Sequence, residues 1–240
     1  MTPDERTFTL DRRFNGPANS ANGGFVCGTV AELAAPSFGP EVTVTLHSPP
    51  PLATPLVLRA GRQRGHVYAG EELIASVAPG ASRPPAPAPV PVEAALRAER
   101  AFAGESGHPF PTCFVCGPDR AAGDGLRLRP GRLPDRPDAV ACTWVPDAGS
   151  VPLLWSVLDC PGGWAADPVT APAVLGRMSA RLLAPAPVGE RCVVVAELLE
   201  RSQRTTRNVS AVYAPDGELV DVADAIWVRV DPAVLQAVRG

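Results

Sequence analysis

This chain of 240 residues contains one C-x-x-C pair, Cys113 and Cys116. Two cysteines at this spacing are typical of metal sites. A structural zinc site needs four ligands, and the sequence has no second C-x-x-C pair. His108 and Cys160 could complete a site only if the fold happened to bring them together. A redox dithiol would need a βαβ context, which is absent around the pair. We therefore expect no metal site and interpret Cys113 and Cys116 as buried thiols in a turn before a strand.

The sequence has no local motif for nucleophilic catalysis by serine or cysteine. No G-x-S-x-G segment is present. Cys160 would need a nearby histidine as a base, and the three histidines, His47, His66 and His108, share no motif with it. A reactive group is therefore expected where separate elements of the chain meet.

Charge and composition exclude several classes of partner. All 22 basic residues are arginines spread over both halves, and with 25 acidic residues they give a net charge of -3, which favours neither nucleic acid nor an anionic membrane. No apolar run approaches the ~20 residues of a spanning helix, and the N-terminus lacks the apolar core of a signal peptide. We expect a cytoplasmic protein with reduced thiols, no nucleic-acid partner and no membrane partner.

A proline-rich segment divides the chain into two parts. Residues 79–91 read PGASRPPAPAPVP, which cannot form a helix interior or a strand ladder. A short helix is expected after it, over residues 92–103. We expect an N-terminal domain over residues 1–78, a linker with that helix over 79–104, and a C-terminal domain over 105–240.

The two parts resemble each other. Val67-Tyr68-Ala69 and Val212-Tyr213-Ala214 contain the two tyrosines of the chain, and each precedes a tight turn and a second strand. Pro50-Pro51-Leu52 matches Ala186-Pro187-Val188 upstream, in the same order. An offset that drifts slowly along the chain indicates a duplicated domain with small loop insertions.

The coarse pattern of each half is one helix among strands of period-two alternation. Such strands favour an antiparallel sheet that buries one face on the helix, an α+β arrangement. The first half predicts strands near residues 8–10, 42–46, 56–59, 67–69 and 73–77, with a helix at 22–34. The second half predicts strands near residues 126–128, 140–144, 176–183, 191–199, 207–214 and 218–230, with a helix at 151–165.

This architecture, present twice, resembles the hotdog fold of acyl-CoA thioesterases. The segment from Cys113 to Pro118 (CFVCGP), followed by Gly125-Leu126, is similar to the opening of many hotdog thioesterases. The segment LWSVLD that ends at Asp159 is similar to their central helix, which carries an acid. Asn22-Gly23-Gly24 resembles the H-G-G helix start of phenylacetyl-CoA-type thioesterases. The resemblance implies a double hotdog, with two antiparallel sheets each wrapped around a central helix.

The resemblance also implies where the site lies. In that family a helix N-terminus of one hotdog binds the thioester oxygen, and an acid on the partner's helix acts on the carbonyl. The first half keeps the helix start Asn22-Gly23-Gly24 but has Ala31 where the acid would stand. The second half keeps Asp159 but begins its helix with Ser150-Val151-Pro152. One composite catalytic site is implied, with Asn22, Gly23 and Gly24 as oxyanion-binding residues and Asp159 as base or nucleophile.

These residue types have the properties that thioester hydrolysis at such a site would need. Glycines let backbone N–H groups approach an oxygen closely, and a helix N-terminus carries partial positive charge. Asp159 in an apolar helix should be desolvated, which raises its pKa. Pro161 should weaken the helix just beyond it. Two ordinary interpretations stay open: Asp159 could belong to a turn, and Asn22-Gly23-Gly24 could be a plain helix cap, with Asn19 or Ser20 as alternative caps.

Three arginines are candidates for the carrier group. Arg201, Arg204 and Arg207 flank the start of a predicted strand and could bind coenzyme A phosphates, since arginine binds phosphate in a bidentate manner and no lysine is available. The alternative is a solvated charge cluster at a strand end.

We therefore expect an enzyme, a thioester hydrolase for acyl-CoA or acyl-carrier-protein substrates, without a cofactor. The two hotdogs should pair as an internal pseudo-dimer, and further homodimerisation stays open. Two alternatives remain: a catalytically silent acyl-ligand-binding protein, and a dehydratase or cyclase of the same fold. The sequence lacks the adjacent Asp and His motif that is typical of such hydratases.

Overall fold

The computed structural model describes residues 4–80, 84–147 and 149–231, and the elements follow the expected order in each half. The first half contains β1 (Asp4–Thr9), the 3-10 turn η1 (Arg12–Phe14), α1 (Gly23–Phe38), β2 (Val42–Leu46), β3 (Pro55–Ala60), β4 (Gly65–Ala69) and β5 (Glu72–Pro79). The remainder contains α2 (Val92–Glu99), α3 (Gly104–Gly107), β6 (Gly131–Leu133), β7 (Arg136–Trp144), α4 (Val151–Ala165), β8 (Ala173–Leu182), β9 (Cys192–Arg201), β10 (Thr205–Tyr213) and β11 (Leu219–Arg229).

The strands form one continuous antiparallel sheet rather than two separate ones. Its order is β1-β3-β4-β5-β2-β8-β11-β10-β9-β7-β6, and the halves join where β2 pairs with β8. Outward from this junction, β5-β4-β3-β1 on one side corresponds to β11-β10-β9-β7 on the other. The halves are therefore related by a pseudo-two-fold axis at the junction, and the expected α+β class, with one central helix for each half of the sheet, is confirmed.

The hairpins that indicated a duplication share a structural detail. The β4–β5 pair has a register shift between Val67 and Tyr68, and the β10–β11 pair has one between Val212 and Tyr213. Both irregularities fall at the tyrosine of the Val-Tyr-Ala repeat. The repeated sequence therefore encodes the same bulged hairpin twice.

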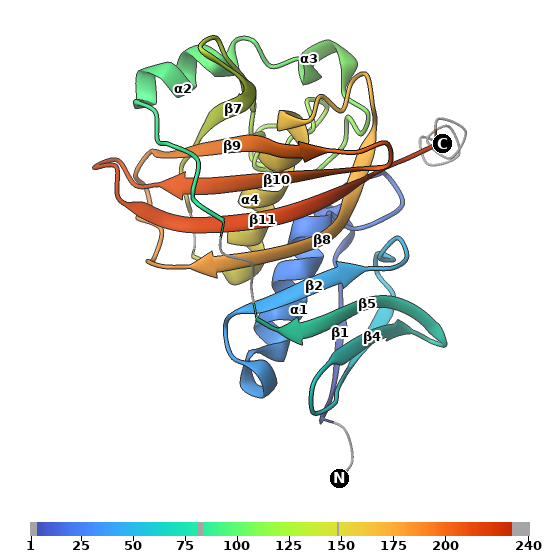
Figure 1. Cartoon of the computed structure of the whole chain (residues 1–240). Coiled ribbons are helices and arrows are strands. Elements are labelled where there is room, and N and C mark those ends of the chain that lie inside the picture. The colour runs from blue at the N-terminus through green and yellow to red at the C-terminus, as the bar shows by residue number, and fades with distance from the viewer. Residues whose placement is uncertain (1–3, 81–83, 148, 232–240) are drawn as a thin grey trace.

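Helices α1 and α4 lie side by side against one face of this sheet (Figure 1). Both are buried on most sides and both contain a proline, yet α1 continues to Phe38 and α4 to Ala165. Their axes come close at two glycines of α1. A Cβ on Gly24 would lie 2.7 Å from the Trp155 carbonyl oxygen, and one on Gly28 would lie 2.6 Å from Pro152 Cα. Only residues without a side chain allow this approach.

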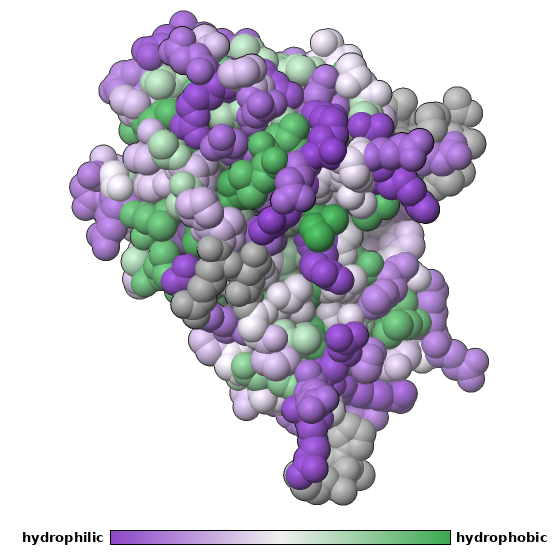
Figure 2. Space-filling model, viewed as in Figure 1, coloured by the Kyte–Doolittle hydropathy of each residue, from purple (hydrophilic) through white to green (hydrophobic). Residues whose placement is uncertain are grey.

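The proline-rich segment packs against the outer face of the sheet. Tyr213 donates a hydrogen bond to the Pro87 carbonyl, and Arg136 donates one to the Ala88 carbonyl at 2.8 Å. Helix α2 covers the same face with Ala95 and Ala98 buried. On the surface of this view, apolar residues form small patches separated by polar ones (Figure 2). None of the described helices has the length and apolar character needed to span a membrane.

The strand expected at residues 126–128 is not present. Arg127 has a φ of 51°, in the left-handed region, which interrupts an extended strand. The amides of Leu126 and Leu128 instead donate to the carbonyls of Phe114 and Val115, at 2.9 and 2.8 Å. This segment is therefore hydrogen-bonded to the loop that contains the C-x-x-C pair.

The close contact of α1 with α4 predicts opposite outcomes for two glycine-to-alanine changes. Gly28→Ala should lower the free energy of unfolding by about 1–3 kcal/mol, because the new methyl group meets the backbone of α4. Gly162→Ala, inside α4 with its nearest neighbours at 3.7 Å, should be neutral or stabilising by up to about 1 kcal/mol. Denaturant unfolding of both variants measures the difference, and equal effects would contradict the helix contact.

Candidate functional site

A cavity of about 510 Å³ is lined by residues of both halves. Its wall is mainly apolar, with Leu175 from β8 and Trp227 from β11, and the start of α1 and the middle of α4 contribute polar groups. Such a space suits an apolar ligand with one polar end. Its polar and sulfur-bearing lining includes Asn22, His108, Cys113, Asp159 and Trp164, with the Gly23 backbone beside them.

At one end of the cavity, Asp159 faces the N-terminus of α1. Its Oδ2 accepts the Gly24 backbone N–H at 2.8 Å and the Asn22 amide at 3.3 Å. Asn22 also caps α1, because its Oδ1 accepts the Phe25 N–H at 2.9 Å. The structure thus brings together the residues that the sequence singled out in different halves.

The two carboxylate oxygens of Asp159 differ in their hydrogen bonding. The side chain is 1% exposed, and Oδ1 has no hydrogen-bond partner among the described residues. Burial raises the pKa of this carboxyl to about 7, although the hydrogen bonds from Gly24 and Asn22 oppose the rise. A carboxyl with one anchored oxygen and one unpaired oxygen at a cavity wall is suited to acid–base or nucleophilic chemistry.

The helix start offers a further donor. Gly23 is the first residue of α1 and lines the cavity, whereas Gly24 donates its N–H to Asp159. Among the described residues we find no acceptor for the Gly23 N–H. This group, with the positive end of the helix dipole, is placed to bind an oxygen of a ligand.

The positions of Asp159 and Asn22 bear on whether Asp159 belongs to a turn and whether Asn22 is a plain helix cap. Asp159 lies inside α4 and not in a turn, because the helix continues through Pro161 to Ala165. Asn22 is the helix cap, as one interpretation had it, but the same side chain also contacts Asp159. Asn19 and Ser20 line the cavity and do not cap the helix.

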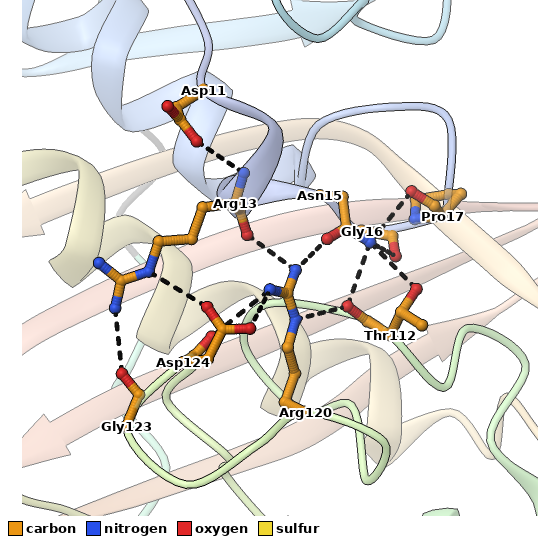
Figure 3. A network of polar contacts seen from close by, with 9 residues as sticks. All are labelled: Asp11, Arg13, Asn15, Gly16, Pro17, Thr112, Arg120, Gly123 and Asp124. Atoms are coloured by element: carbon orange, nitrogen blue, oxygen red, sulfur yellow. Dashed lines mark hydrogen bonds and ion pairs between the residues drawn. The ribbon is translucent and has the colours of Figure 1, made fainter.

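A polar network holds the loop before α1 against the C-x-x-C loop. Figure 3 shows Arg120 at its centre, with contacts to the Arg13 carbonyl, the Asn15 amide oxygen and the Asp124 carboxylate. Asn15 in turn donates to the Thr112 carbonyl at 3.1 Å. Because Thr112 precedes Cys113, this network fixes the position of the cysteine loop relative to Asn22.

The fold brings a third sulfur to the C-x-x-C pair. The Sγ atoms of Cys113, Cys116 and Cys160 all lie within 4.8 Å of one another, and that of Cys113 is 3.8 Å from that of Cys160. All three residues are buried, and all line the cavity. From the sequence, Cys160 could join the pair only if the fold happened to bring it there, and the structure does so. The available signal was a lone cysteine directly after Asp159.

Nitrogen donors surround the three sulfurs. Trp164 Nε1 donates to Cys116 Sγ at 3.4 Å, and the Asn22 amide donates to Cys160 Sγ at 3.6 Å. His108 Nε2 lies 3.2 Å from Cys116 Sγ. Hydrogen bonds from the thiols of Cys116 and Cys160 lower the pKa of Cys113 well below the ordinary thiol value. Cys113 is therefore the sulfur that most readily carries negative charge.

The three candidate arginines do not line the cavity. Arg207 forms ion pairs with Glu200 at 3.2 Å and Asp224 at 2.9 Å, which raise its pKa. Arg204 lies in the β9–β10 turn, where its backbone N–H donates to Ser202 Oγ at 3.3 Å. Arg201 donates to the Ala166 carbonyl at 3.3 Å, just beyond α4 and between the cavity residues Trp164 and Pro168.

A scan against protein-family models and a search of curated protein sequences found no match. Solved structures of similar shape exist. Acyl-CoA thioesterase II TesB2 from Mycobacterium marinum is 14% identical, with a TM-score of 0.57 over 96% of this chain and 94% of that one. A protein with hot dog fold from Alicyclobacillus acidocaldarius is also 14% identical, with a TM-score of 0.58 over 95% and 94% of the two chains.

The dehydratase domain of PpsC from Mycobacterium tuberculosis, solved with C12:1-CoA, is a further neighbour. It is 14% identical, with a TM-score of 0.54 over 94% of this chain and 93% of that one. At these identities the likeness is one of fold. It confirms the expected double hotdog, so the chain has a fold that thioesterases and dehydratases share.

Proposed function

We propose that this protein is an enzyme that hydrolyses acyl thioesters of coenzyme A or of an acyl carrier protein. The observation that carries the proposal is the buried carboxyl of Asp159 held against the N-terminus of α1 at the wall of an apolar cavity. The fold neighbours are compatible with it, since one is an acyl-CoA thioesterase and another was solved with an acyl-CoA.

In the proposed complex the acyl chain occupies the apolar cavity. The thioester carbonyl oxygen accepts the Gly23 N–H, where the helix dipole stabilises the negative charge that develops on it. Asn22 fixes the end of α1 and orients the Asp159 carboxylate, and Gly24 holds Oδ2 of that carboxylate. Each half of the chain therefore contributes one part of a single site.

The unpaired Oδ1 of Asp159 is the reacting atom in this proposal. As a base, it removes a proton from the attacking water and passes it to the leaving sulfur, so the carrier leaves as a thiol. As a nucleophile, it attacks the carbonyl carbon and the carrier leaves as a thiolate; water then hydrolyses the acyl–Asp159 anhydride, which regenerates the carboxylate and supplies the proton that the thiolate takes up. Removing this carboxylate takes away the reacting group but leaves the cavity and the oxyanion donors in place.

Asp159→Asn is expected to lower kcat/KM for acyl-CoA hydrolysis about 10²–10⁴-fold, because it removes the base or nucleophile and keeps the side-chain shape. Release of free thiol over a panel of acyl-CoA chain lengths measures this. The matched control is Asp138→Asn, an exposed acid on β7, which should keep full activity.

Unchanged turnover in Asp159→Asn would remove Asp159 from the mechanism. A wild-type chain that binds acyl-CoA tightly but hydrolyses no chain length would support the acyl-ligand-binding alternative and contradict the enzymatic proposal.

For the carrier phosphates we propose Arg201, with Arg204 nearby in the β9–β10 turn. Arg201 lies beside the segment that links α4 to the cavity wall, whereas the charge of Arg207 is already compensated by Glu200 and Asp224. Arg201→Ala should raise KM for acyl-CoA about tenfold with kcat unchanged, since a charged hydrogen bond to substrate is lost. Arg207→Ala is the control and should change KM little; the reverse ranking would contradict this assignment.

A dehydratase is the second candidate, because His108 and Asp159 line the same cavity. Both ring nitrogens of His108 already have protein contacts, to Phe110 N–H and Cys116 Sγ, which disfavours it as an acid–base group. Spectrophotometric measurement of enoyl-CoA hydration tests this candidate, and hydration faster than hydrolysis would favour it.

A further inference from the structure

None of the three clustered cysteines has a role in the proposed hydrolysis. Cys113 and Cys116 come from the loop before β6, and Cys160 comes from α4, so two distant segments place three sulfurs within 4.8 Å of one another. Each side chain is at most 5% exposed, and each lines the cavity. We propose that Cys113, Cys116 and Cys160 bind one zinc ion at the cavity wall.

The spacing of the sulfurs fits a tetrahedral thiolate site. With Zn–S bonds of about 2.3 Å and tetrahedral angles, two coordinating sulfurs lie about 3.8 Å apart. Cys113 Sγ and Cys160 Sγ are separated by 3.8 Å. The other separations do not exceed 4.8 Å, so an adjustment of about 1 Å or less would bring all three sulfurs to coordinating distance.

The C-x-x-C loop is held tightly in the conformation that directs both sulfurs to one point. The Gly117 N–H donates to the Cys113 carbonyl at 2.8 Å, and a Cβ on Gly117 would lie 2.5 Å from Cys113 N. Side-chain N–H donors of Trp164 and Asn22 surround the sulfurs, and outer-shell contacts of this kind orient metal ligands.

The surrounding donors suit charged sulfur better than neutral thiols. Trp164 Nε1 can only donate, and it points at Cys116 Sγ. The Asn22 amide lies 3.6 Å from Cys160 Sγ and 4.0 Å from Cys113 Sγ. Three thiolates and one Zn²⁺ leave a net charge of -1, which these N–H groups stabilise.

His108 acts as an outer-shell donor and not as the fourth ligand. The Phe110 N–H donates to His108 Nδ1 at 2.9 Å, so the neutral ring carries its proton on Nε2. That proton faces Cys116 Sγ at 3.2 Å and leaves no lone pair on Nε2 for a metal. The fourth position therefore belongs to water or to a group from the cavity, as in zinc sites with three protein ligands.

The test starts from the full wild-type chain, purified under reductant without chelator. Elemental analysis should find about one zinc per chain. After exchange for Co²⁺, the thiolate-to-cobalt absorption should have the intensity of three thiolates. Alkylation followed by mass spectrometry should label three more cysteines after chelation than before. These readouts need no variant and do not depend on hydrolysis, so they distinguish this site from the proposed function.

Variants assign the ligands. Cys113→Ser and Cys160→Ser should each lower metal content at least tenfold, whereas Cys142→Ser, a buried cysteine on β7 outside the cluster, should keep it. His108→Gln should still bind one Co²⁺ at saturation. Circular dichroism confirms that each variant is folded.

Three results would overturn the proposal. The first is a wild-type chain that holds less than a tenth of an equivalent of zinc and gives no cobalt spectrum. The second is a disulfide between two of these cysteines in that reduced preparation. The third is loss of the cobalt bands in His108→Gln at saturating metal, which would make His108 a ligand and remove the three-sulfur assignment.

Discussion

The close contact between α1 and α4 is the constraint on which the rest of the structure depends. Gly24 and Gly28 let the two helices touch through backbone, so the N-terminus of one reaches the middle of the other. A larger residue at Gly24 would occupy the space of the Asp159 Cβ. The hydrogen bond between the Gly24 amide and the Asp159 carboxylate exists because no side chain separates them.

Duplication explains how one chain supplies both helices. Equivalent strands β2 and β8 pair at the centre of the sheet, so the two halves extend one sheet and share one pseudo-two-fold axis. Such symmetry would create two equivalent positions, and among the described residues the two positions differ. At the start of α4, Pro152 has no N–H to offer a ligand, and α1 carries Ala31 in place of an acid. One half has kept the helix start and the other has kept the acid.

The buried carboxyl of Asp159 depends on the donors that face it. An isolated carboxylate is costly to bury, and Asp159 is tolerated because the α1 N-terminus, a backbone amide and the Asn22 side chain all face it. The same Asn22 amide reaches toward two sulfurs of the cysteine cluster. The Arg120 network then holds the cysteine loop on the first half, so both clusters depend on the same interface between halves (Figure 3).

The sequence alone determined the elements and their repetition. Period-two alternation, the Val-Tyr-Ala hairpins and the helix starts at Asn22 and Ser150 are local signals, and all but one of the elements that they predicted are present in the structure. A local signal misled at residues 126–128, because the positive φ of Arg127 and bonds to the cysteine loop replace the expected strand.

Only the tertiary structure decided what these elements bring together. The pairing of β2 with β8, the hydrogen bond from Gly24 to Asp159 and the approach of Cys160 to Cys113 all join residues far apart in the chain. Contacts of this kind depend on how two helices and one sheet pack in space. The spacing of residues along the sequence does not determine the distances between them in the fold. The sequence could name Asn22, Gly24 and Asp159 through a resemblance, but packing set the 2.8 Å between the Gly24 nitrogen and the Asp159 carboxylate.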